Sequence, residues 1–307
     1  DRVGKGLRTA PRDALLAESV PAARRGTAFG LHRGADHLGS VLWPLTAAGL
    51  LWLLPGRLRL VFGLALLPGL ASLPVVWRGV RETGDAERPA GGRPGPDAGA
   101  ETGPTAGTSR PLGLGRPFAA YVTVVVLFTL GNASDAFLLL RAADLGVPTA
   151  AIPLLWGVLH LSKTAWSVPG GALADRVPPW RVIAAGWAVY AAVYGGFALA
   201  TTAGQVWALF GVYGLYFGLT ESPEKALVAA YAPADGKARA FGVFHAAVGF
   251  AALPASLLFG WVWETWGARE AFFVGAGLAL AAALVLPFLR RPPSGATSPR
   301  APGGTRG

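Results

Sequence analysis

Long apolar stretches separated by short polar segments run along most of this chain. A helix that crosses a bilayer needs about 20 mostly apolar residues. Windows of this kind cover residues 38–54, 60–77, 118–134, 149–174, 182–220, 240–263 and 271–289. The window 182–220 is too long for one span, and a polar turn at residues 201–204 divides it into two helices. With the charged helix before Pro21, the pattern predicts nine membrane-spanning helices, the first of them incomplete.

Two segments lack this apolar pattern. Residues 79–116 and 290–307 are dense in Gly, Pro and Arg, a composition typical of disordered chain. The sequence therefore predicts four parts. They are a remnant of an N-terminal bundle at 1–78, a linker at 79–116, a six-helix bundle at 117–289 and a tail at 290–307.

The composition supports a membrane protein. Charged residues make up 14% of the chain and hydrophobic residues 52%, whereas soluble domains carry about 25% charged residues. A chain this poor in charge cannot cover a water-facing surface, so we expect a lipid bilayer to cover it. The chain has no Cys, which excludes disulfides and thiolate metal sites.

An internal repeat relates two parts of the chain at a shift of 212 residues. Residues 6–30 and 218–242 align without a gap, and 11 of the 25 positions are identical. Parallel repeats of this kind are typical of transporters built from two similar halves. The second copy has six predicted spans and the first has three. We therefore expect the chain to be an N-terminally truncated part of a protein with twelve spans.

The basic residues predict the orientation in the membrane. The loops and tail on one side contain sixteen Lys and Arg residues, and the loops on the other side contain four. Because cytoplasmic loops carry the excess of positive charge, the linker and the C-terminal tail are expected in the cytoplasm. The net charge of +10 then reflects topology and gives no reason to expect a nucleic-acid partner. The use of 4 Lys against 23 Arg favours a GC-rich bacterial genome and hence a bacterial plasma membrane.

A short motif carries a resemblance to a known family. Residues 170–181 read GGALADRVPPWR, which resembles the cytoplasmic signature of the major facilitator superfamily between spans 8 and 9. The motif departs from the family pattern at Pro178, where glycine is usual. Residues 1–19 and 219–229 are also similar to a bacterial subgroup described only as transporters. The resemblance implies an all-α fold of two helical bundles and a gating role for Asp175 and Arg176.

Charged residues in the predicted spans form one candidate gate. A charge at the bilayer centre costs at least about 2.5–3.5 kcal/mol, so such residues should pair or face a cavity. The candidates are Arg8, Arg12, Asp13, Glu224 and Lys225. The repeat aligns Arg12 with Glu224 and Asp13 with Lys225, with the charges reversed. A pseudo-twofold arrangement would bring these opposite charges together, and we interpret them as locks between helices.

A second set of residues suits a substrate cavity or ion coupling. It comprises Arg33, Asp36, Asp135, His160, Lys163 and Glu221. His32 and Arg33 share a helix face with Asp36, and Glu221 can pair with Lys225 at i,i+4. A carboxylate in an apolar cavity can load and release a proton, which makes Asp36 and Glu221 the candidates for proton coupling. Asp135 is equally well explained as a solvated helix end.

One face of the span at 149–174 carries a polar stripe. Its members are Trp156, His160, Lys163 and Ser167, which fall on one side of a helix at i,i+3 and i,i+4 spacing. Such a stripe can contact an anionic group of the substrate or a coupling carboxylate. The alternative is that Lys163 extends to the interface and His160 is an ordinary core residue.

These features together favour a secondary active transporter of a small molecule, coupled to protons. Nothing in the sequence matches a nucleotide-binding loop, and we expect no cofactor, metal or catalytic residue. Pro44 stands near a Gly-Pro motif of some exporters, which favours efflux, although Trp43 replaces the glycine. The alternatives are a truncated fragment without activity and, more remotely, a membrane-embedded enzyme.

Overall fold

The structure of the protein is a computed structural model that describes residues 2–54, 57–64, 66–79, 114–233 and 236–289. Every regular element within these ranges is a helix, which confirms the predicted all-α class. Most of the predicted linker at 79–116 and the whole predicted tail at 290–307 lie outside the described residues, as do the side chains of Arg8 and Pro44.

The chain divides into two compact units. The first unit comprises residues 1–44 and 114–307, and the second comprises residues 45–113. The second unit contains α3 (Leu58–Leu64) and α4 (Leu66–Gly79), which contact each other. These two helices cover the single span predicted at 60–77, and residue 65 between them lies outside the described residues. The predicted bundles at 1–78 and 117–289 stay a prediction.

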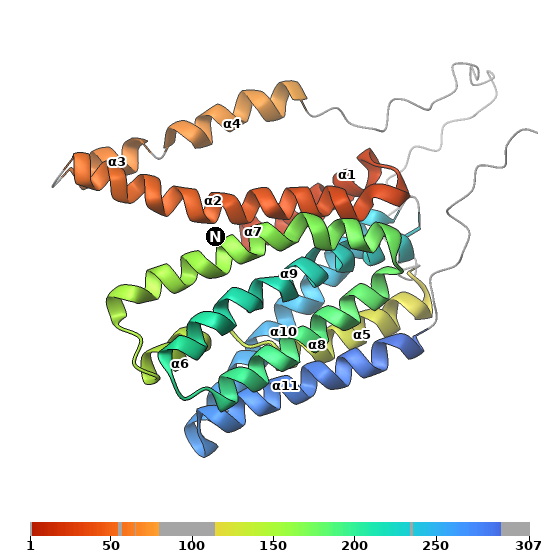
Figure 1. Cartoon of the computed structure of the whole chain (residues 1–307). Coiled ribbons are helices and arrows are strands. Elements are labelled where there is room, and N and C mark those ends of the chain that lie inside the picture. Colours follow the sequence, from red (N-terminus) through yellow and green to blue (C-terminus); the bar gives the residue numbers. More distant parts are fainter. Residues whose placement is uncertain (1, 55–56, 65, 80–113, 234–235, 290–307) are drawn as a thin grey trace, which may run out of the picture. The chain divides into compact units, whose positions relative to one another are not determined.

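The first unit is a bundle of helices whose axes are roughly aligned, some running in the same direction and some in opposite directions (Figure 1). Its most extensive contacts join α7 to α9 and α8 to both α9 and α11. The N-terminal α1 packs on α10. The helices of this unit are α1 (Arg2–Ser19), α2 (Arg25–Leu53, of which residues 25–44 belong here), α5 (Gly115–Gly131), α6 (Ala136–Asp144), α7 (Ile152–Arg176), α8 (Pro179–Leu199), α9 (Ala203–Tyr231), α10 (Lys237–Trp266) and α11 (Ala268–Val285).

Local sequence signals set several helix ends. The turn predicted at residues 201–204 is confirmed, because α8 ends at Leu199 and α9 begins at Ala203. Thr202 and Gln205 form a capping box there, in which each side chain accepts a hydrogen bond from the other residue's backbone N–H. Gly267 separates α10 from α11 with a φ of 109°, a conformation that residues with a Cβ rarely adopt.

The internal repeat extends to the helix boundaries. Helix α1 ends at Ser19 and α9 ends at Tyr231, while α2 begins at Arg25 and α10 begins at Lys237. Both boundaries are therefore displaced by 212 residues, the same shift that aligns the two sequences. The two copies fold into equivalent helix pairs, as expected for a protein of two similar halves.

Four helical stretches of the described residues are long and apolar enough to cross a membrane. Their mean hydropathy is 1.7 to 2.2, and they are Gly115–Asp144, Pro179–Leu199, Lys237–Trp266 and Ala268–Phe288. Helices α2, α7 and α9 have 29, 25 and 29 residues but carry ionisable side chains along their length. The total of nine spans stays a prediction.

Glycines allow α7 to approach both α2 and α9 closely. A Cβ at Gly26 or Gly30 of α2 would meet the carbonyl oxygen of Gly171 or Ser167 of α7. On the other side of α7, a Cβ at Gly218 of α9 would meet the carbonyl oxygen of Trp166. Small residues at these spacings let helix backbones touch, and they place the side chains of α2 and α9 near those of α7.

Candidate functional site

Six ionisable side chains form a continuous polar row within the first unit. We call them the central row, and they are Arg33, His37, Asp135, His160, Lys163 and Glu221. Glu221 of α9 lies beside α2, because its carboxylate is 2.9 Å from Nε2 of His37 and 3.7 Å from Nε of Arg33. This contact joins a helix of the first repeat copy to a helix of the second.

Helix α7 continues the central row. The ring of His160 is 5.9 Å from that of His37. The ammonium group of Lys163 lies 3.5 Å from the ring centre of Phe217 and 3.7 Å from a carboxylate oxygen of Asp135. Only 6% of the Lys163 side chain is exposed. On the predicted polar face of α7, Lys163 therefore lies near a carboxylate of another segment and His160 lies near His37.

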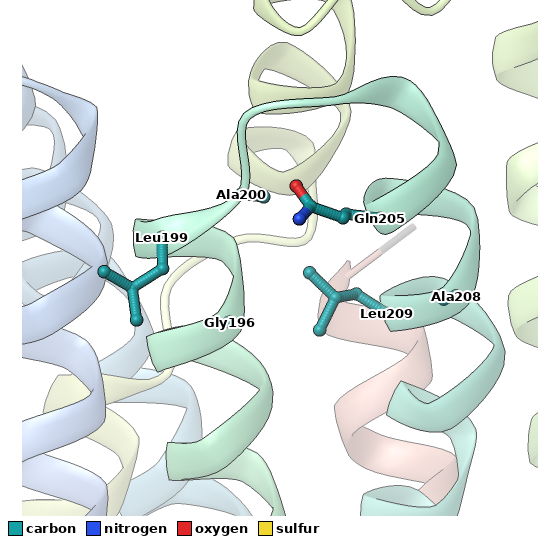
Figure 2. Close-up of a pocket in the computed structure, with 6 residues that line it drawn as sticks. All are labelled: Gly196, Leu199, Ala200, Gln205, Ala208 and Leu209. Atoms are coloured by element: carbon teal, nitrogen blue, oxygen red, sulfur yellow. The ribbon is translucent and has the colours of Figure 1, made fainter.

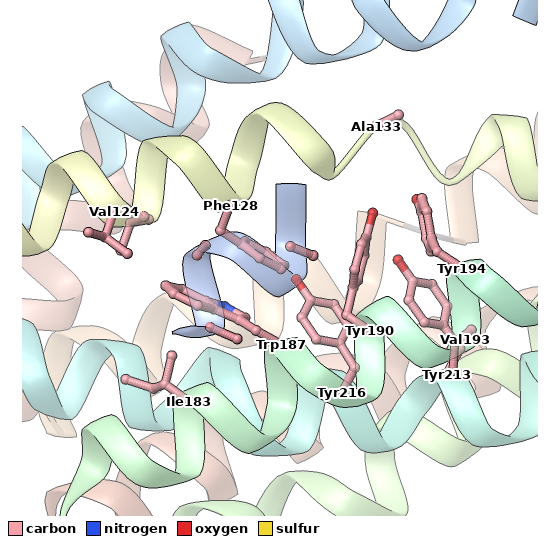
Figure 3. Packing of buried hydrophobic residues seen from close by; sticks show 14 of the residues in the cluster. Val124, Phe128, Ala133, Ile183, Trp187, Tyr190, Val193, Tyr194, Tyr213 and Tyr216 are labelled. Atoms are coloured by element: carbon pink, nitrogen blue, oxygen red, sulfur yellow. The ribbon is translucent and has the colours of Figure 1, made fainter. Parts of the chain in front are cut away.

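A break in the helix at residues 132–135 presents Asp135. Tyrosines of α8 and α9 point toward this break (Figure 3) and bind its polar groups. Tyr190 donates a hydrogen bond to the carbonyl oxygen of Gly131 at 3.0 Å, and Tyr213 donates one to Asp135 at 3.1 Å. The amide of Asn132 donates to the hydroxyl of Tyr216 at 3.2 Å. The break is thus held by buried partners, which non-helical backbone in a membrane requires.

Asp36 lies at the margin of the central row. Its carboxylate is 3.6 Å from both His32 and Arg33, its neighbours on the same helix, as the i,i+3 and i,i+4 spacing predicts. Its side chain is 45% exposed, against 24% for Glu221. Of the two predicted coupling carboxylates, Glu221 is the one that contacts another helix.

A second polar cluster lies between α1, α9 and α10. We call it the Asp13 cluster, and it consists of Arg12, Asp13, Lys225 and His245. The carboxylate of Asp13 is 3.0 Å from the Lys225 ammonium, 2.9 Å from Nε2 of His245 and 3.2 Å from the Arg12 guanidinium. Asp13 is 0% exposed and the Lys225 side chain 3%. The repeat predicted that Asp13 and Lys225 would meet, and they do.

The other pair aligned by the repeat does not form in the described structure. Arg12 contacts its neighbour Asp13. Glu224 instead accepts a hydrogen bond from the indole of Trp187 at 3.1 Å. The expected pairing of Glu221 with Lys225 is likewise replaced, since each binds a residue of α1 or α2. Glu221 and Lys225 thus take partners from other helices, whereas Arg12 binds its own neighbour on α1.

Asp175 of the GGALADR motif caps the N-terminus of α2. Its carboxylate accepts hydrogen bonds from the backbone N–H groups of Gly26 and Thr27 at 2.7 and 2.8 Å and from the Thr27 hydroxyl at 2.6 Å. These N–H groups have no partner within their own helix, and a negative charge is favourable at this end. Arg176 is exposed at the end of α7.

Two hollows adjoin these elements. A cavity of about 590 Å³ is lined by the break at residues 132–135, by Phe217 and by α10. A second hollow of about 330 Å³ lies where α8 meets α9 (Figure 2). Its polar side chain, Gln205, is engaged in the capping box, whereas the first hollow adjoins the central row through Asp135 and Phe217. Among the described residues, no group of three or more His, Cys, Asp or Glu residues could hold a metal ion.

The sequence profile of the Major Facilitator Superfamily matches residues 2–236. The chain belongs to this superfamily. It is a multi-pass membrane protein and a membrane transporter, as the apolar helices and the names of its relatives also indicate.

Relatives of the superfamily differ in how much is known of them. An uncharacterized MFS-type transporter of Methanocaldococcus jannaschii is 29% identical over 94% of this chain and 70% of its own length. An uncharacterized protein of Mycobacterium tuberculosis is 27% identical over 86% of the chain and 63% of its own length. A probable galactarate/D-glucarate transporter of Escherichia coli is 27% identical over 54% of the chain and 40% of its own length. The chain thus spans roughly two thirds of the first two relatives.

Sequence reasoning missed three residues that bind carboxylates of the two polar clusters. His37 and His245 were visible within predicted spans but had no assigned partner, and they bind Glu221 and Asp13. The spacing of His37, four residues after Arg33, was the available signal. Tyr213 gave no signal, because its hydrogen bond to Asp135 joins segments 78 residues apart.

Proposed function

We propose that the protein is a secondary active transporter that moves a small molecule by alternating access. The contact that carries the proposal is that of Glu221 with His37 and Arg33, because it joins helices of the two repeat copies beside a cavity. Rocking of one bundle against the other would break and remake such contacts. The repeat, the capped end of α2 and the membrane fold all support this cycle.

We also propose that a proton on Glu221 drives the conformational change. Protonation removes the negative charge that attracts Arg33 and His37, and this loosens α2 from α9. Asp36, which is half-exposed and pairs within its own helix, is assigned no part in this step. The proposed direction is efflux, on the basis of Pro44 alone. The proposed location is a bacterial plasma membrane, with the linker and tail in the cytoplasm.

Of the relatives, the Escherichia coli protein has a named substrate, and the match covers 40% of it. We therefore take from it the transport class and not the galactarate/D-glucarate substrate. The mode of transport is best tested without a substrate, through accessibility of the cavity.

Alternating access can be tested with a single cysteine in the cavity. The chain has no Cys, so Ala252→Cys, on the α10 wall of the cavity, is the one thiol within it, and any Cys that the full reading frame encodes elsewhere is replaced by Ser. The protein encoded by the full reading frame is placed in oriented membrane vesicles and treated with an impermeant thiol reagent from either side. We expect labelling from both sides. Labelling from one side only would refute alternating access.

The same cysteine tests the proton step. The ratio of labelling from the two sides should change between acidic and neutral buffer in the Ala252→Cys protein. Adding Glu221→Gln should abolish this change, whereas adding Asp36→Asn should preserve it. A ratio that still responds to pH in the Glu221→Gln protein would overturn the assignment of Glu221.

A further inference from the structure

The strong cations of the central row lack hydrogen-bond acceptors. An ammonium group has three N–H donors and no acceptor. Within the described residues, Lys163 has its nearest carboxylate oxygen at 3.7 Å, which is longer than a hydrogen bond. Its other neighbour is the ring of Phe217, which attracts a cation without accepting strong hydrogen bonds. A charge buried to this extent needs a partner, because desolvation costs several kcal/mol.

Arg33 has the same deficit. Its Nε is buried and has no hydrogen-bond partner among the described residues. The carboxylates of Asp36 and Glu221 lie 3.6 and 3.7 Å from its guanidinium. These distances permit attraction between the charges but no hydrogen bonds.

The carboxylates of the central row are better supplied. Glu221 has Nε2 of His37 at 2.9 Å, and Asp135 accepts a hydrogen bond from Tyr213 at 3.1 Å. The groups that the site lacks are therefore acceptors rather than donors. A bound amine would add donors to a site that already has too many, whereas a bound anion would supply acceptors.

The cavity of about 590 Å³ gives such an anion room beside Lys163. Asp135 and Phe217 both contact Lys163 and both line the cavity. A small organic molecule fits, since ligand pockets have volumes of about 300–1,000 Å³. One edge of the cavity is polar and its wall is apolar. The polar edge includes Thr129, Asn132, Ser134 and Ser256, and the wall on α10 includes Val248, Ala252 and Leu253.

We propose that this cavity binds an organic carboxylate, and that Lys163 is its anchoring cation. The carboxylate accepts hydrogen bonds from the Lys163 ammonium and takes the place of the long contact with Asp135. Hydroxyl and amide groups of the polar edge then bind the rest of the molecule. This inference names the substrate class of the proposed transporter, and so it rests on the proposed function.

Binding of carboxylates can be compared with binding of their uncharged amides. The probes are gluconate, succinate and benzoate, each beside its amide, at equal ionic strength. Thermal unfolding of the purified protein is followed by the fluorescence of its Trp residues. A ligand that binds only the folded protein raises the unfolding midpoint, and the rise grows with the ratio of its concentration to its Kd. We expect at least one carboxylate to raise the midpoint while its amide does not.

Two results of this comparison would overturn the proposal. One is that no carboxylate of the three shifts the midpoint. The other is that an amide shifts it as much as its carboxylate. Either result would show that the charge of an anion is not what the site recognises.

Variants locate the effect at Lys163. Lys163→Met should abolish the carboxylate shift, and Lys163→Arg should retain part of it. Lys237→Met is the matched control, since Lys237 lies outside the central row and pairs weakly with Glu18 at 3.9 Å. If Lys163→Met does not fold, Ser256→Leu fills the cavity from α10 and should also abolish the shift. A full shift in either Lys163→Met or Ser256→Leu would contradict the proposed site.

The outcome is separable from that of the transport proposal. Binding is measured without turnover, so a protein that binds a carboxylate but shows one-sided labelling of Ala252→Cys fails only as a transporter. A protein with two-sided labelling and no carboxylate shift fails only as a carboxylate binder.

Discussion

The two polar clusters of this protein are built differently, although both bring charges of one repeat copy to the other. In the Asp13 cluster a fully buried carboxylate has an ammonium, a guanidinium and an imidazole within 3.2 Å. In the central row, Arg33 and Lys163 have their carboxylate partners at 3.6 to 3.7 Å, and a cavity lies beside them. Close, dry ion pairs are costly to break, whereas long ones beside a cavity can exchange partners. The first arrangement suits a fixed joint and the second suits a site that binds and releases.

The largest expected effect is on stability, when a lysine of each cluster is replaced by methionine. Lys225→Met removes the ammonium that neutralises Asp13 and should destabilise the fold by about 3–5 kcal/mol. Lys163→Met removes a contact longer than a hydrogen bond and leaves Asp135 with Tyr213 and the cavity, so it should cost clearly less. Thermal unfolding of the purified variants measures the difference. Equal losses would mean that the two clusters do not differ in the way their distances suggest.

An intermediate effect concerns the close packing of α7 against α9, which sets the separation of the charged groups in the central row. Gly218→Ala places a methyl group against the backbone of Trp166, and overpacking of this kind costs about 1–3 kcal/mol. Gly211 lies on the same helix with nothing within 4 Å of its added Cβ. Gly211→Ala should therefore be neutral or stabilise by up to about 1 kcal/mol. Unfolding midpoints measure both changes, and a loss of similar size in both would show that α7 and α9 are not in close contact.

The smallest effect concerns the N-terminus of α2, which Asp175 of α7 caps. This contact involves none of the ion pairs of the two clusters. Asp175→Asn keeps one acceptor but loses the charge at the helix N-terminus, and should cost about 1 kcal/mol. We expect the labelling ratio of Ala252→Cys to shift as well, because the motif then holds α2 less firmly. Asp144→Asn, the same change at an exposed position at the end of α6, is the control and should change neither quantity. An unchanged labelling ratio in Asp175→Asn would show that the motif has no role in gating.

Much of the fold could be predicted because its signals are local. The turn between α8 and α9 was visible as a polar interruption of an apolar run, and the capping residues Thr202 and Gln205 form it. The repeat was visible as identities at one shift, and the boundaries of α1, α2, α9 and α10 follow the same shift. The apolar run predicted at 60–77 is helical in its described residues.

The candidate site could be predicted only in part. The meeting of Asp13 with Lys225 followed from reversed charges at equivalent positions of the repeat. The partners of Glu221 and Glu224 did not follow, because each carboxylate had several cations or donors within reach. Their choice depended on how closely the helices pack, which is a matter of glycines on α2, α7 and α9.

The sequence by itself determined the helical membrane fold, the family and the repeat. It also pointed to nearly all the ionisable residues of the two polar clusters. These properties depend on composition, periodicity and short motifs, which neighbouring residues are enough to define. Only the tertiary structure decided that His37 binds Glu221 and His245 binds Asp13. It also decided that Asp175 caps α2 and that a cavity lies beside Lys163. Those contacts join residues far apart in the chain, and burial leaves each charge to be neutralised by whichever partner the packing brings within reach.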